Sequence, residues 1–231
     1  MEFAISDTDA AVRARLTSPP LREESLKIST DGIVRGRYLL TFSRRALLPG
    51  PAARLQALAG DLGLDASALM PHRSAANAIH VGMEPGNRTK LYLEFPPPDA
   101  PTPHLAFLAV KHDNRINRYN RIDHLTLDQQ TQRLRDVVPY SPARVTALAC
   151  LVRAGGVLQV TEDGSTRNSI DIHLADAAMT VGDLPELTAL LAGHSDNLSD
   201  IRHMKLGHFA CGIGRDGTAF ATIYFGGRRD P

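Results

Sequence analysis

Hydrophobic and polar residues alternate along five pairs of segments in this chain, and a short turn joins the members of each pair. In the segment RTKLYLEF, residues 88–95, the polar Lys90, Tyr92 and Glu94 alternate with leucines and a phenylalanine. Such a period of two places the two kinds of residue on opposite faces of a β-strand. The predicted hairpins occupy residues 26–42, 78–95, 104–127, 157–174 and 205–225. We therefore expect about ten strands, paired along the chain as antiparallel hairpins.

Segments with helical periodicity lie before and between these hairpins. They cover residues 6–18, 50–64, 126–138, 141–156 and 181–197. Ser6 is placed to cap the first helix, and Pro142 lies near the start of the fourth, where a proline is well tolerated. The proline-rich segment PPPDAPTP between the second and third hairpins is expected to be extended.

The predicted elements indicate an α+β fold in which the strands must protect their edges. Closure of about ten antiparallel strands into a barrel, with helices packed outside, removes the edges at once. A strongly curved sheet serves the same end, and an open sheet with helices on one face is the alternative. No change in composition marks a domain boundary, so we expect residues 1–231 to form a single domain.

Composition and charge indicate the general class of protein but exclude few functions. With 43% hydrophobic and 22% charged residues the chain is typical of a soluble globular protein, and its formal charge of +1 gives no electrostatic reason to expect a nucleic-acid or membrane partner. There is no signal peptide and no long apolar run, which favours a cytoplasmic location. Cys150 and Cys211 both lie in apolar contexts and are expected to be buried thiols.

The polar faces of the predicted strands carry the candidate chemistry. They bear cations, hydroxyls and carboxyls, among them Arg35, Arg37, Lys90, Tyr92, Glu94, Lys111, Arg167, Asp171, His173, Thr222 and Tyr224. Antiparallel sheets commonly have one face in water, which explains alternation by itself. A tyrosine on the polar face favours the other interpretation, the wall of a partly buried site, because a phenol stacks and hydrogen-bonds there.

Two other signals are weaker. The Asn-Arg repeat NRINRYNR, residues 114–121, combines groups that grip phosphates and stack on bases, but its setting favours an exposed or subunit-contacting link. His173 and Asp171 share a strand face while Asp176 lies beyond it, so we expect no metal site. No phosphate-binding glycine loop, dinucleotide fingerprint or hydrolase motif is present, and no cofactor is expected.

The repeated strand-strand-helix units, the KLY of residues 90–92 and the closing GRDGTAFATIYF resemble the aromatic prenyltransferases of the ABBA or PT-barrel type. The resemblance implies a ten-stranded antiparallel barrel with a solvent-filled lumen. Lysine, arginine and tyrosine on its inner strands would hold an allylic diphosphate, with an aromatic acceptor beside it. It assigns Lys90 and Tyr92 to the diphosphate, and Tyr224, together with Tyr92, to shielding of an allylic cation.

Strand phase, rather than the resemblance, adds Arg37, Lys111 and Arg167 as anion-binding candidates, and Glu94 or Asp171 as the group that takes the proton of the acceptor. The leading hypothesis is thus a biosynthetic enzyme that transfers a prenyl group within a barrel. A non-catalytic barrel that binds a small ligand is the first alternative, favoured by the low aromatic content of 5%. A structural or assembly protein with an open sheet is the second.

Overall fold

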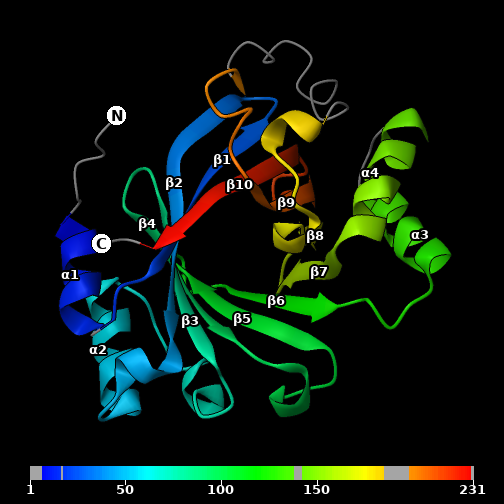
Figure 1. The fold of residues 1–231 in the computed structure, drawn as a ribbon. Helices are drawn as coiled ribbons and strands as arrows, with labels where there is room; N and C mark the ends of the chain where they lie inside the picture. Colours follow the sequence, from blue (N-terminus) through cyan, green and yellow to red (C-terminus); the bar gives the residue numbers. More distant parts are fainter. Residues whose placement is uncertain (1–6, 17, 138–141, 185–197, 230–231) are drawn as a thin grey trace. The chain divides into compact units, whose positions relative to one another are not determined.

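The computed structural model describes residues 7–16, 18–137, 142–184 and 198–229 (Figure 1). Each strand is hydrogen-bonded to its neighbours in the sequence, and β1 is bonded to β10, so the ten strands form a closed barrel. The strands are β1 (Leu21–Ser29), β2 (Gly32–Ser43), β3 (Ala78–Glu84), β4 (Arg88–Glu94), β5 (Leu105–Lys111), β6 (Ile116–Arg121), β7 (Gly156–Glu162), β8 (Asn168–His173), β9 (Leu206–Ile213) and β10 (Ala219–Arg229). The predicted closed barrel is therefore confirmed, and the open-sheet alternative is wrong.

Four α-helices accompany the strands in the described residues: α1 (Asp7–Arg15), α2 (Pro51–Asp61), α3 (Leu127–Val137) and α4 (Pro142–Ala154). The chain divides into two compact units. One comprises the described residues within Met1–Arg22, Arg37–Tyr119 and Arg228–Pro231, and the other those within Glu23–Gly36 and Asn120–Gly227. We call these the first and the second unit.

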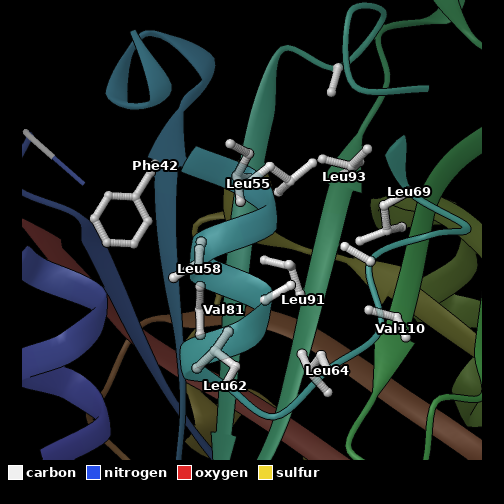
Figure 2. Close-up of a cluster of buried hydrophobic side chains, with 14 of the residues drawn as sticks. Phe42, Leu55, Leu58, Leu62, Leu64, Leu69, Val81, Leu91, Leu93 and Val110 are labelled. Carbon is white, nitrogen blue, oxygen red and sulfur yellow. The ribbon is translucent and has the colours of Figure 1, made fainter. Parts of the chain in front are cut away.

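In the first unit, α2 packs on the apolar face of β3, β4 and β5 (Figure 2). Leu55 and Leu58 of the helix contact an apolar cluster that includes Val81, Leu91 and Leu93 of the strands, and all five are fully buried. Each side chain of this kind contributes about 1.5–3 kcal/mol when it leaves water. The apolar half of the alternating pattern thus fixes which strand face the helix covers, and the polar half lies on the other face.

In the second unit, α3 and α4 lie side by side (Figure 1), and a second apolar cluster joins them to β7–β10. Ile170 and Ile172 of β8, Phe209 of β9 and Ile223 of β10 form its strand side, and Leu134 of α3 is among the helical residues. The same alternation operates here, so that Asp171 and His173 fall on the face opposite the cluster.

The proline-rich segment and one cysteine differ from what the sequence predicts. In the hairpin turns, Gly32, Gly86 and Asn87 have positive φ, which suits tight turns. The proline-rich segment contains one 3₁₀ turn, Pro97–Asp99, because the fixed φ of proline suits the first turn of a helix. Cys150 is exposed, contrary to expectation, whereas Cys211 is buried and its thiol has a raised pKa, chiefly through burial.

Ser6 and most of the helix predicted over residues 181–197 lie outside the described residues, which show only a 3₁₀ turn at Val181–Asp183. In the part of the chain that the structure describes, no helix has the length and apolar character needed to cross a membrane.

Candidate functional site

The polar face of the first unit gathers four charged side chains from four adjacent strands. Lys90 of β4 stands opposite Lys111 of β5 in the strand register, and Arg37 of β2 and Glu84 of β3 occupy the neighbouring strands. Gly82 lies opposite Lys90 on the other side. Because paired residues of adjacent strands share a face, the register brings these groups together on one surface.

Glu84 holds two of the cations with a single oxygen. The Nη2 atom of Arg37 donates a hydrogen bond of 2.9 Å to Oε1 of Glu84, and Nζ of Lys90 donates one of 2.5 Å to the same atom. The side chains of Arg37 and Lys90 are only 8% and 14% exposed. Burial by itself would raise the pKa of Glu84, but Lys90 and Arg37 outweigh it and hold the pKa far below its ordinary value. The carboxylate is therefore ionised at every physiological pH.

This pairing gives the protein a specific sensitivity to acid. Because the pKa of Glu84 is lower in the folded chain than its ordinary 4.5, the stability that it contributes is fully present above about pH 4.5 and is lost as the pH falls further. We expect the free energy of unfolding, measured in urea, to drop between about pH 6 and about pH 3 by more in the wild type than in Glu84→Gln. Equal drops in the two proteins would show that the pairing does not form.

A chain of hydrogen bonds crosses the same face. His80 of β3 contacts the hydroxyl of Thr41 with Nδ1 at 2.8 Å and the carboxylate of Glu94 with Nε2 at 2.9 Å. An ionised carboxylate only accepts, so Nε2 carries the hydrogen and Nδ1 of a neutral ring accepts from the threonine hydroxyl. Glu94 is 31% exposed and His80 is buried. The hydrogen bonds orient a partly exposed carboxylate.

Aromatic rings lie beside this carboxylate. The rings of Tyr92 and Tyr119 have centroids 5.9 Å apart, and Phe107 lies 5.8 Å from Tyr119 and 5.4 Å from His80. Ala109 is the register partner of Tyr92 on β5, so a small residue flanks the phenol there. The arrangement is an aromatic wall with a carboxylate and cations along its border.

Four members of this group are not among the residues predicted from the sequence: Glu84, His80, Phe107 and Tyr119. The alternation of the strand does place Glu84 and His80 on one face. Five predicted residues do come together in the first unit: Arg37, Lys90, Tyr92, Glu94 and Lys111.

The remaining three predicted residues belong to the second unit. Arg167 lies over the ring of Phe220, with its guanidinium carbon 5.6 Å from the ring centroid. Tyr224 packs near His208, with ring centroids 5.5 Å apart. Asp171 is buried, and its pKa is raised to about 7, mainly by burial and further by the charge of Glu23, with Arg167 acting in the opposite direction. These three residues therefore belong to the polar side chains of the second unit.

Comparison with solved structures places the fold. The chain is similar to 5-dimethylallyltryptophan synthase from Streptomyces coelicolor, with 15% identity, a TM-score of 0.55, and coverage of 89% of this chain and 80% of that one. AnaPT from Neosartorya fischeri gives 12% identity and a TM-score of 0.52, over 91% and 80% of the two chains. The fold is that of the ABBA-type prenyltransferases. The resemblance to the prenyltransferases drawn from the sequence is thus confirmed as a likeness of fold.

A complex of the Streptomyces coelicolor synthase with DMASPP and Trp matches as well, with a TM-score of 0.54 and 15% identity over 99% of this chain and 83% of that one. No protein-family model matches the sequence, and no curated protein matches it significantly. The prenyltransferase likeness accordingly rests on the similarity of fold rather than on shared sequence.

Proposed function

We propose that this protein transfers a prenyl group from an allylic diphosphate to an aromatic acceptor on the polar face of the first unit. The observation that carries the proposal is the convergence of Arg37 and Lys90 on one carboxylate oxygen, beside Lys111. An oxygen anion held by two buried cations supports a surface that binds oxygen anions. Diphosphate oxygens carry the same kind of charge and accept the same hydrogen bonds.

The chemistry follows from these groups. The bond between the allylic carbon and the diphosphate oxygen breaks, and the electron pair leaves with the diphosphate, which Lys90, Arg37 and Lys111 stabilise. The π-faces of Tyr92 and Tyr119 stabilise the allylic cation through the ring quadrupole. The cation then bonds to a carbon of the acceptor ring, and Glu94 takes the proton that this carbon loses.

The choice of Glu94 over Asp171 rests on position. Glu94 follows Lys90 and Tyr92 at alternate positions of one strand, so the base lies on the face that carries the cations. Its hydrogen bond to His80 keeps the carboxylate oriented. The likeness in fold to a synthase solved with DMASPP and Trp supports a small-molecule donor and an aromatic acceptor.

Replacement of Lys90 by Ala tests the donor site. We expect an allylic diphosphate to bind about 10 to 100 times more weakly to Lys90→Ala, since a hydrogen bond to a charged group contributes about 1.5–3 kcal/mol. Calorimetric titration with a series of allylic diphosphates of increasing chain length measures this. Lys205→Ala, at an exposed lysine of the second unit, is the control and should bind as the wild type does.

If no member of the series binds the unmodified protein, the transferase proposal fails. Binding without product formation, across a panel of aromatic acceptors, would instead select the non-catalytic ligand-binding barrel. The low aromatic content of 5% favours this second function, because a carbocation site usually needs several aromatic walls. Four rings, those of His80, Tyr92, Phe107 and Tyr119, nevertheless lie near Glu94. The few aromatic residues are thus concentrated where the proposed cation would form.

A further inference from the structure

A cluster of potential metal ligands lies on the polar face of the second unit. Asp171 and His173 alternate on β8, and His208 is the register partner of His173 on β9. One donor atom from each of the three residues lies within 4.8 Å of the others. Two residues spaced i and i+2 on one strand, with a third on the adjacent strand, point their side chains to the same side of the sheet.

Asp171 provides an independent sign that a ligand belongs here. Asp171 is 7% exposed, and its Oδ1 atom is buried without a hydrogen-bond partner. A buried carboxylate oxygen that lacks a partner is costly, and native proteins rarely retain one without a reason. Nδ1 of His208 is the imidazole atom that faces this oxygen, at 3.8 Å, which is too far for a hydrogen bond.

The other nitrogen of His208 faces a second carboxylate. Nε2 of His208 is 4.0 Å from Oε2 of Glu23 on β1. Metal-binding histidines regularly donate their second ring N–H to a carboxylate, which fixes the tautomer and the orientation of the ring. At 4.0 Å the pair is not yet hydrogen-bonded, but Glu23 lies on the side of His208 from which a small movement would let it accept that N–H.

We propose that Asp171, His173 and His208 bind a divalent transition-metal ion of the zinc class, with Glu23 orienting His208. Two imidazoles and one carboxylate are a donor set that zinc and its neighbours favour, whereas calcium and magnesium favour oxygen ligands. Two ligands of one zinc ion lie about 3.3 Å apart when each bond is about 2 Å. The observed 3.8 Å between Asp171 and His208 requires only a small approach of the two side chains.

The expectation of no metal from the sequence rested on Asp176, which falls outside the strand. The structure supplies His208 in its place, 35 positions beyond His173 in the sequence and adjacent to it in the sheet. The proposal stands apart from prenyl transfer, since it concerns different residues and its test does not use activity.

The test is a calorimetric titration of the chelator-treated full chain with Zn²⁺ alone. The visible absorption spectrum of the Co²⁺ form is the second measurement. We expect one ion per chain and a rise in the melting temperature when Zn²⁺ is added. Asp171→Asn and His208→Ala should each weaken binding at least 100-fold, and Glu23→Gln about 10- to 100-fold. His203→Ala, at an exposed histidine of the same unit, should bind as the wild type does.

Asp171→Asn also separates loss of metal from loss of fold. In the presence of chelator this isosteric variant should melt at or above the temperature of the wild type, because it removes a buried charge. Only the wild type should gain stability from Zn²⁺. The proposal is overturned if the wild type shows no saturable binding, or if a folded Asp171→Asn binds Zn²⁺ as tightly as the wild type.

Discussion

A chain that ends at Thr218 is expected not to fold. Deletion of residues 219–231 removes β10, which pairs with β9 from Ala219 to Phe225 and lies next to β1 in the barrel order. The loss opens two strand edges at once and withdraws Ile223 and Phe225 from the apolar cluster of the second unit. Circular dichroism and a thermal melt of the truncated chain should show no cooperative transition, and gel filtration should show association.

A point substitution gives a graded form of the same test. Ile223 is 1% exposed, and Ile223→Ala is expected to lower the free energy of unfolding by about 2–5 kcal/mol. Asp216→Ala, in the exposed turn before β10, should cost far less. A truncated chain that stays monomeric and melts as the full chain does would contradict the closed barrel.

Glu84→Gln should be among the most damaging substitutions in the first unit and the one that an added anion rescues. Removal of one partner of a buried ion pair costs about 3–5 kcal/mol, and we expect about 3 kcal/mol because the Glu84 side chain keeps 21% of its exposure. Arg37 and Lys90 then lose the carboxylate between them. Added pyrophosphate should raise the free energy of unfolding of the variant and restore much of what it lost. The same addition should raise that of the wild type by less.

The surface pair between Arg15 and Asp61 is the matched control. Its shortest nitrogen–oxygen distance, 2.7 Å, is as close as those at Glu84, but its side chains are 47% and 30% exposed. Asp61→Asn should therefore leave the free energy of unfolding almost unchanged, with no response to pyrophosphate. A Glu84→Gln variant that behaves like Asp61→Asn would mean that the cations of the polar face are solvated rather than held for an anion.

The alternating pattern predicted the strands and their faces because it depends on local spacing. Ile170 and Ile172 could be assigned to the apolar side, and Asp171 to the polar side, without knowledge of any neighbour. The partners could not be assigned, since register between strands is set by turns and by packing across the sheet. Glu84 between Arg37 and Lys90, and His208 beside His173, are both results of register.

Strand alternation also fails where the backbone is irregular. Counting alternate positions predicts that Arg35 and Arg37 share the polar face. Gly36 between them has a φ of 72°, in the left-handed region, which breaks the alternation of the strand. Arg35 instead bonds to Asp200 with both terminal nitrogens, at 3.1 and 3.4 Å, on the exposed surface of the second unit.

The shared oxygen of Glu84 also has a consequence for selectivity among ions. A carboxylate already seated between Arg37 and Lys90 is an internal competitor, tethered by the chain and present at a constant effective concentration. Chloride and other monovalent ions bring no more charge than this competitor and gain little by displacing it. An anion with several negative charges engages Lys111 as well as Arg37 and Lys90. The surface therefore selects anions mainly by their charge, and less by their shape.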